Sequence, residues 1–171
     1  MTSQIERFAN EARRRRRHAR RRAILAAIVG AGTTILSAAT FAAPSCSFNS
    51  SAPVSFGVYD VLSASPNVNG VGSITIKCQG GGPHTFVVSL SRGQSNSYAF
   101  RVMKSGGNSL NYNLYTSTQR TRVWGDGTGG SRTMTVERNS TTTLSIFGEI
   151  PAGQDAATGI YLDNIAATVD F

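Results

Sequence analysis

Residues 73–78 read SITIKC, and this stretch decides the fold class. The apolar residues Ile74, Ile76 and Cys78 occupy every second position, and polar residues lie between them. Because successive side chains of a β-strand point to opposite faces, the stretch predicts a strand with one buried face and one solvated face. Such half-buried strands are typical of antiparallel sheets.

The same alternation recurs along the rest of the chain, between clusters of Gly, Pro, Asn and Ser that predict turns. The expected inward sets are Phe86, Val88 and Leu90; Leu110, Tyr112 and Leu114; Leu144, Ile146 and Ile150; and Tyr161, Ile165, Ala167, Val169 and Phe171. Asn111 and Asn113 are expected to point outward. No helical periodicity and no internal repeat interrupt the pattern. We therefore predict one all-β domain over residues 43–171, an antiparallel sandwich of about eight strands, with a barrel as the alternative.

The N-terminal 42 residues have a different composition. They contain nine Arg and two Glu, a net charge of +7 out of +8 for the whole chain, and the arginines gather in RRRRRHARRR at residues 13–22. An uncharged apolar stretch with small residues at its end follows. This order is that of a secretory signal peptide over residues 1–42. We expect cleavage after Ala42, which places Thr40 at the third position before the cut; a cut after Ala31 is the alternative.

Three other interpretations of this leader are weaker. Basic residues do not cluster after residue 43, so we expect no nucleic-acid partner. A membrane anchor would need a more apolar stretch than residues 23–43, which contain Gly, Thr and Ser, so contact with a membrane is expected only during export. The RRAIL sequence loosely fits a twin-arginine signal, but a disulfide formed after export argues against that route.

Cys46 and Cys78 are the two cysteines of the chain. In an exported protein such a pair predicts one disulfide formed in an oxidising compartment, here between an early strand and the end of a neighbouring one. Closing this loop stabilises a small domain by roughly 3 to 4 kcal/mol in the chain-entropy model. A metal site is not indicated, because His84 is the single histidine of residues 43–171.

No set of residues predicts catalysis. His84 lies in the turn GGGPHT, the seven acidic residues after residue 43 are scattered, and GDGTGG at 125–130 is typical of a hairpin turn more than of a calcium loop. We therefore expect no enzyme activity and no cofactor. Trp124, the single tryptophan, either covers the core at a strand end or presents a surface contact to a ligand.

Five motifs keep their order and approximate spacing over residues 46–171. They read CSFNSSAPVSFGVYDVLSASP, GSITIKCQGG, VVSLSRG, LNYNLYTSTQRTRVWGDGTGG and FGEIPAGQDAATGIYLDNIAATVDF. In these motifs the chain resembles the spore coat protein U domain family, which includes pilin-like subunits of archaic chaperone/usher pili. The matching positions are Cys46 and Cys78 for the family's disulfide, Phe56, Gly57, Tyr59 and Asp60, then Pro151 to Gly153, and finally Gly159, Tyr161 and Asp163.

The resemblance implies an immunoglobulin-like sandwich that lacks one strand, so that a groove between its first and last strands exposes the core. A periplasmic chaperone would fill this groove first, and a strand of a neighbouring subunit would replace it at an outer-membrane usher. The protein would then be a structural subunit of a fibre or coat that crosses the periplasm to the cell surface. The residues expected along the open edge are Phe48, Phe56, Tyr161, Ile165, Ala167, Val169 and Phe171. A complete eight-stranded sandwich would show the same alternation and is the alternative.

The expected mature chain differs from polymerising pilins at its start. After a cut at Ala42, three residues precede Cys46, too few to reach a neighbour's groove. The subunit would then accept a strand without donating one, as a tip subunit does. A cut after Ala31 would leave GTTILSAATFAAPS as a donor strand. The alternative function is a secreted module that binds a surface or glycan through Trp124.

Overall fold

The computed structural model describes residues 43–170, which form eight strands. The strands are β1 (Ser45–Ser55), β2 (Val71–Gln79), β3 (Thr85–Leu90), β4 (Arg101–Ser105), β5 (Asn108–Tyr115), β6 (Met134–Glu137), β7 (Ser140–Glu149) and β8 (Ala167–Asp170). Every pair of neighbouring strands is antiparallel. The all-β prediction is confirmed. No helix long and apolar enough to span a bilayer occurs within the described range. The predicted signal peptide and Phe171 lie outside the described residues.

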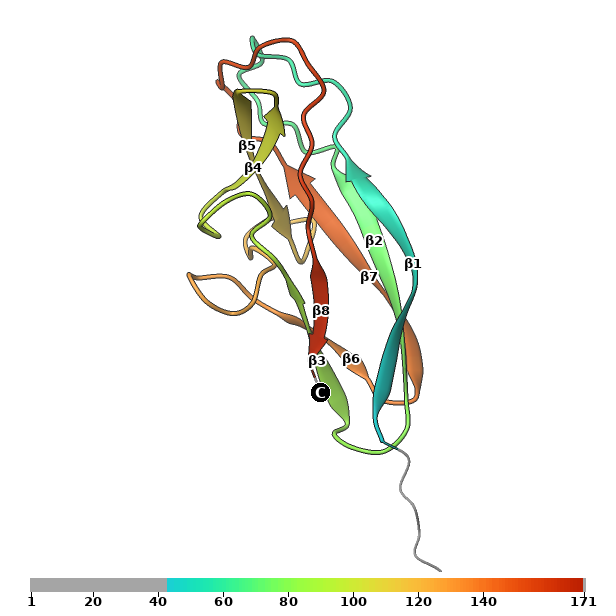
Figure 1. Ribbon diagram of the computed structural model, residues 1–171. Coiled ribbons are helices and arrows are strands. Elements are labelled where there is room, and N and C mark those ends of the chain that lie inside the picture. Colours follow the sequence, from blue (N-terminus) through green and yellow to red (C-terminus); the bar gives the residue numbers. More distant parts are fainter. Residues whose placement is uncertain (1–42, 171) are drawn as a thin grey trace, which may run out of the picture. The chain divides into compact units, whose positions relative to one another are not determined.

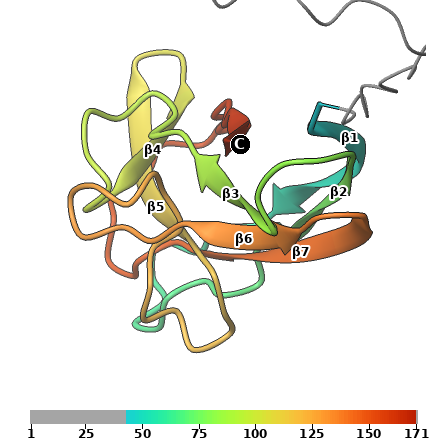
Figure 2. The ribbon, with the colours of Figure 1, turned by 90° about the horizontal axis from the view of Figure 1, so that it is seen from below.

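The strands form two sheets that pack against each other as a sandwich (Figures 1 and 2). One sheet has the order β1-β2-β7-β5-β4, and the other has the order β6-β3-β8. The first strand, β1, and the last described strand, β8, are therefore edge strands of different sheets. This arrangement confirms the antiparallel sandwich and excludes the closed barrel.

The core lies between the sheets and consists of the predicted inward residues. Ile76, Phe86, Val88 and Trp124 have no exposed surface, and Ile74, Leu110, Tyr112, Leu114, Leu144, Ile146 and Ile150 are also buried. Opposite residues of β2 and β7 lie on the same face, so alternate pairs such as Ile74 and Leu144 contribute to the apolar layer, whereas Thr75 and Thr143 pair on the outer face.

Asn113 corrects one prediction. It was expected to point outward with Asn111, but its side chain is buried. Its Oδ1 accepts a hydrogen bond of 2.8 Å from a guanidinium nitrogen of Arg101, and its Nδ2 donates to the carbonyl of Tyr98 at 2.9 Å. The alternation rule fails here because a buried cation on the adjacent strand needs a polar partner inside the sandwich.

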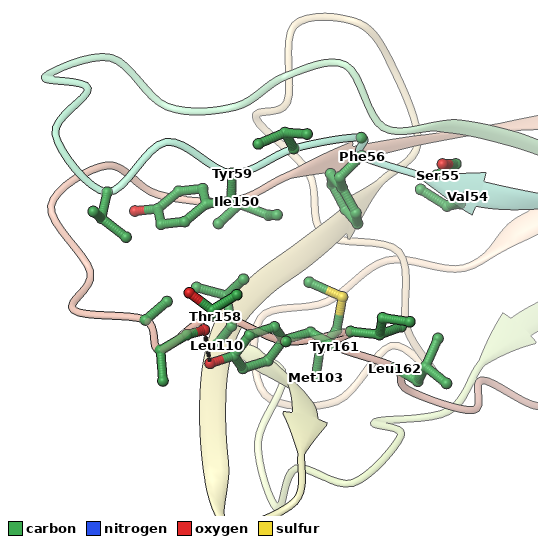
Figure 3. A pocket seen from close by; sticks show the side chains of 17 residues that line it. Val54, Ser55, Phe56, Tyr59, Met103, Leu110, Ile150, Thr158, Tyr161 and Leu162 are labelled. Atoms are coloured by element: carbon green, nitrogen blue, oxygen red, sulfur yellow. Dashed lines mark hydrogen bonds between the residues drawn. The ribbon is translucent and has the colours of Figure 1, made fainter.

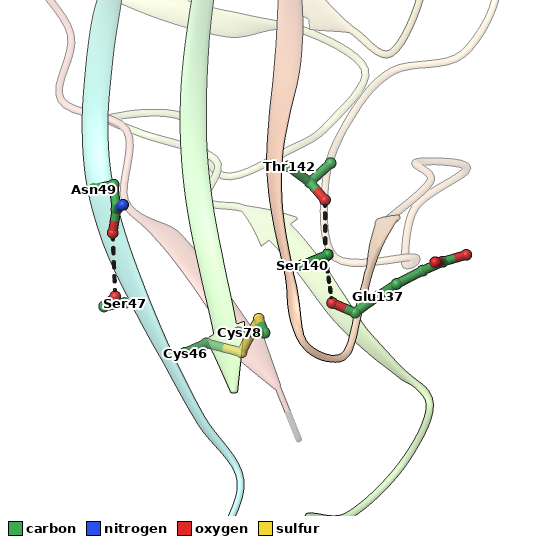
Figure 4. Close-up of a disulfide and its surroundings, with 7 residues drawn as sticks. All are labelled: Cys46, Ser47, Asn49, Cys78, Glu137, Ser140 and Thr142. Atoms are coloured by element: carbon green, nitrogen blue, oxygen red, sulfur yellow. Dashed lines mark hydrogen bonds between the residues drawn. A yellow bond between two sulfur atoms is a disulfide. The ribbon is translucent and has the colours of Figure 1, made fainter. Parts of the chain in front are cut away.

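The predicted disulfide is present. Cys46 on β1 lies directly opposite Cys78 on β2, with 4.1 Å between their Cα atoms, and the bond holds the first strand to its neighbour (Figure 4). Farther along, β1 shifts register twice against β2, between Phe48 and Ser50 and again between Ala52 and Ser55. These bulges add local twist to an edge strand.

Candidate functional site: an apolar groove between β1 and β8

One wall of the candidate site is β1, whose inward side is incompletely covered. Phe48 pairs with Ile76 of β2, so the two side chains lie on the same face of the sheet. Ile76 has no exposed surface, whereas 51% of Phe48 is exposed. The difference arises because Phe48 lies at the edge, where no described strand covers it.

The segment 161–170, which ends in β8, forms the other wall. Its side chains alternate strictly between half-buried and exposed. The half-buried face carries the predicted inward residues Tyr161, Ile165, Ala167 and Val169, all of which pack against the core. None of them reaches the burial of the residues on β2 or β3, so this face is packed from one side only.

The backbone of this segment is also paired on one side. Leu162 exchanges two hydrogen bonds with Lys104 of β4, at 2.9 and 3.0 Å, and the carbonyl of Ala166 accepts one from the amide of Ser91 at 2.8 Å. Neighbouring residues of an extended chain direct their backbone groups to opposite sides. The odd-numbered residues of the segment therefore turn their N–H and C=O groups away from β3 and β4, towards the open edge.

A groove lies between the two walls. Its first part, about 350 Å³, runs between residues 51–54 of β1 and residues 161–167. The floor of this part is core: Ile74, Leu90, Met103, Tyr112, Leu114 and Ile146. Its second part, about 650 Å³, lies between residues 54–61 and 156–162 (Figure 3). Val54, Phe56, Met103, Tyr161 and Leu162 line both parts, so the two form one continuous groove.

The residues predicted for the open edge fall into three groups. Phe56, Tyr161, Ile165 and Ala167 line the groove, although Phe56 is a buried part of its floor and not an edge residue. Val169 and Phe48 lie on the same two walls beyond it, and Phe171 lies outside the described residues. The structure thus brings most of the predicted set together, and their role in strand docking stays a prediction.

Phe56 is at the centre of the groove floor. Its ring packs edge-on against Tyr112, with 5.8 Å between ring centroids. A Cβ atom at Gly70 or Gly148 would overlap the ring, so both positions require glycine. The sequence motifs include Phe56 and Gly148, but their contact, and the need for glycine at Gly70, became apparent only from the structure.

Tyr59 joins two of the motifs at the end of the groove. Its hydroxyl donates to the carbonyl of Pro151 at 2.9 Å and accepts from the amide of Gln154 at 3.0 Å. The side chain of Gln154 in turn pairs with both backbone groups of Asn111 on β5, at 2.8 and 2.9 Å. Tyr59 and the segment after β7 therefore support each other, which the sequence did not reveal.

Asp163 is the one charged residue among the described residues that line the groove. Its Oδ2 accepts a 2.7 Å hydrogen bond from the hydroxyl of Tyr112, and its Oδ1 accepts from the amides of Gln94 and Asn164 at 3.0 and 2.8 Å. Burial, together with the hydrogen bond to Asp163, raises the pKa of Tyr112 well above its ordinary value. Tyr112 therefore stays protonated and remains a donor to the carboxylate.

The β4 side of the sandwich is held by Arg101. This side chain has no exposed surface, and its guanidinium donates to the carbonyls of Ser91 and Trp124 as well as to Asn113. Its guanidinium carbon also lies 5.3 Å from the ring centroid of Tyr98. Every buried side-chain nitrogen or oxygen among residues 43–170 has a hydrogen-bond partner. The network is thus complete without another chain.

Trp124 belongs to this side and corrects a second prediction. It was considered as a surface contact, but it has no exposed surface, and its Nε1 donates to the carbonyl of Val88 at 3.0 Å. The interpretation that it covers the core is confirmed. An aromatic residue next to a glycine-rich turn looks exposed in sequence because the strand that it packs on is distant in the chain.

The remaining candidate motifs are turns. In the 125–130 turn, the backbone and side chain of Thr128 both donate to Oδ1 of Asp126, which lowers the pKa of that carboxyl. His84 is exposed in the turn before β3. Residues 43–170 contain no group of three or more His, Cys, Asp or Glu side chains placed to hold a metal ion.

Comparison with known proteins agrees with the motifs. Residues 32–168 match the model of the family described as Spore Coat Protein U domain, and the chain therefore belongs to this family. A relative is Protein U of Myxococcus xanthus, which is 28% identical over 141 residues, 74% of this chain and 77% of that protein.

A solved structure shares the fold. It is a crystal structure described as the CsuC-CsuE chaperone-tip adhesion subunit pre-assembly complex from archaic chaperone-usher Csu pili of Acinetobacter baumannii, with a TM-score of 0.53 and 21% sequence identity. The similarity covers 75% of this chain and 40% of that chain, so the present protein spans less than half of its length. At this identity the likeness supports the immunoglobulin-like pilin fold.

Proposed function

We propose that the protein is a non-catalytic structural subunit of an extracellular fibre or coat, and that its groove accepts an extended strand from a partner chain. The observation that carries the proposal is the apolar groove between β1 and β8, whose floor is core and whose walls are half-exposed. Apolar surface of this kind ordinarily marks an interaction site. The unpaired backbone groups of the odd-numbered residues of 161–170 suit a strand that adds to the sheet edge.

Filling the groove would cover the apolar faces of both walls at once. A strand between β1 and β8 would cover Phe48 on one wall and Ile165 and Val169 on the other, and would pair with at least one free edge. Each buried methylene contributes about 0.8 kcal/mol, so several side chains of the strand would make the complex much more stable than the empty subunit. An empty edge also favours association with other chains.

The proposed partners are the chains that would cover the groove. We propose that a periplasmic chaperone occupies the groove during export, that an outer-membrane usher passes the subunit on, and that a neighbouring subunit takes the chaperone's place at the cell surface. The family membership supports the role, and the similar crystal structure is of a chaperone-bound subunit. The alternative of a surface- or glycan-binding module loses its principal residue, because Trp124 is buried.

The position of the subunit in a fibre depends on its N-terminus. We propose cleavage after Ala42, which leaves three residues before Cys46 and makes the protein an acceptor only, as at a tip. The family match begins at residue 32, where a chain cut after Ala31 would start, and such a chain could also donate a strand. N-terminal sequencing of the exported protein distinguishes the two: a start at Gly32 contradicts the acceptor-only role.

A stability measurement tests the function itself. The exported chain is expected to aggregate or to unfold at low temperature alone, and to become soluble and gain thermal stability when a strand peptide or the chaperone is added. The variant Thr168→Asp, on the exposed face of β8, is a control that should respond in the same way. A chain that is stable and monomeric alone, with a melting temperature that no strand changes, would contradict the proposal.

A further inference from the structure

We propose that the strand filling the groove carries a hydrogen-bond donor side chain in register with Asp163, between apolar residues two positions away on either side. The occupant is an extended segment of a neighbouring subunit. This inference rests on the proposed function, because it names the chemistry of the strand that the groove accepts.

The groove has one charged residue among its lining residues. All others in both parts are apolar, small or uncharged, and Asp163 lies on the inward face of the last segment between Tyr161 and Ile165. A strand that lies against this face presents every second side chain to it. Its inward residues must therefore be apolar, then polar, then apolar to match the three positions.

The polar position requires a donor. The hydroxyl of Tyr112 gives its single hydrogen to Oδ2 of Asp163, so this hydroxyl can only accept a further bond. A carboxylate has about four acceptor positions, and the amides of Gln94 and Asn164 with Tyr112 occupy three. At Asp163, therefore, only acceptor positions remain for the incoming strand. An apolar side chain placed over them would remove water from the carboxylate and give nothing in return.

Asp163 cannot withdraw from the groove. A Cβ atom at Gly93 would overlap its carboxylate, and the amide of Gln94 in the same loop holds Oδ1. Gly93 has a φ of +62°, in the left-handed region that favours glycine. The loop after β3 therefore packs against the carboxylate on the side away from the groove. This contact holds the acceptor at one position along the segment 161–170. A fixed polar position in an apolar interface selects one register, as a buried polar residue does in coiled coils.

A peptide with this pattern is available from the chain itself. Residues 33–42 read TTILSAATFA, in which Ile35, Ser37, Ala39 and Phe41 occupy alternate positions. The hydroxyl of Ser37 is a donor with apolar residues two positions to either side. The peptide serves as a probe of the groove, and its Ser37→Ala form removes the donor without a change of pattern.

The test measures how well each peptide displaces a labelled reference strand peptide from the exported chain, because the empty chain is expected to aggregate. The unaltered peptide is expected to bind about 10-fold more tightly than the Ser37→Ala peptide, a difference of about 1.4 kcal/mol. With the double variant Asp163→Leu, Tyr112→Phe, which removes both the carboxylate and the hydroxyl acceptor, the ratio should fall close to one. With Tyr112→Phe, which frees Oδ2, the preference should persist. Thr168→Val, on the outer face of β8, should leave both affinities unchanged.

Three outcomes would overturn the inference in different ways. Equal affinity of the two peptides for the unaltered chain contradicts the register proposal and leaves strand docking intact. A preference that survives in a folded Asp163→Leu, Tyr112→Phe double variant contradicts the role of Asp163. Binding of neither peptide contradicts the proposed function. If the double variant does not fold, peptides with the serine moved to position 35 or 39 replace it, and equal binding of these shifted peptides contradicts the inference.

Discussion

On the β4 side of the sandwich, a buried arginine joins Asn113 of the neighbouring strand to the loops that contain Ser91 and Trp124, and every buried side-chain nitrogen or oxygen of residues 43–170 has a hydrogen-bond partner. On the β1 and β8 side, aromatic and aliphatic side chains stay half-exposed around a groove, and backbone groups lack a strand to pair with. On the first side, hydrogen bonds within the chain satisfy the buried polar groups. On the second side, apolar surface remains available to another chain. A substitution on the first side should therefore damage folding, and one on the second should damage association.

The largest expected effect is on the β4 side. Trp124→Ala should lower the free energy of unfolding by roughly 3 to 5 kcal/mol, because it empties a fully buried site and removes the hydrogen bond to Val88. Denaturant titration of the strand-bound protein measures the change. Phe100→Ala is the matched control, since 49% of that ring is exposed and its loss should cost much less. A small effect of Trp124→Ala would contradict the expectation that substitutions on the β4 side damage folding.

The disulfide should have the next largest effect. Replacing Cys46 and Cys78 with alanine is expected to lower the free energy of unfolding by about 3 kcal/mol and to loosen β1 at its start. Comparing unfolding with and without reductant checks this, with the double variant as the control that reductant should leave unchanged. Equal stability of the reduced and oxidised chains would mean that sheet pairing alone holds β1.

A charge placed in the groove should separate folding from association. Ile165→Asp, on the inward face of the last segment, is expected to weaken strand binding roughly 100-fold, about 2.7 kcal/mol. The same residue placed outward, in Thr168→Asp, should bind normally. Peptide titration gives the affinities and circular dichroism the folding of both variants. If both variants bind alike, the two faces of the segment are not distinct as the structure has them.

The smallest effect should appear at alkaline pH. The pKa of Tyr112 is raised by burial and by Asp163, whereas in the unfolded chain a tyrosine ionises near pH 10. A raised pKa contributes stability below the unfolded value and loses it as the pH rises above that value. The free energy of unfolding should thus fall above pH 10. Tyr112→Phe should fall less steeply over the same range, and an identical slope would contradict this origin.

The fold could be predicted from local patterns, but the polar contacts could not. Alternation in stretches such as SITIKC is a property of neighbouring residues, and it located the strands and the half-buried face of residues 161–169. The Arg101 network joins Ser91, Asn113 and Trp124, which are far apart in the chain. Two of the three acceptors are backbone carbonyls, which have no signature in sequence, and the third is the side-chain amide oxygen of Asn113. The candidate groove combines the two cases. Its walls could be predicted from the alternation, whereas the fixed acceptor at Asp163 became apparent only from the geometry.

The two bulges in β1 also affect contacts between empty subunits. An edge strand pairs most readily with a straight, regular edge, and bulges interrupt such pairing. The edge strand β1 shifts register twice within a single strand, whereas the pairing of β8 is regular. Pairing between the β1 edges of two subunits is therefore disfavoured, and β8 offers the more regular edge to an added strand.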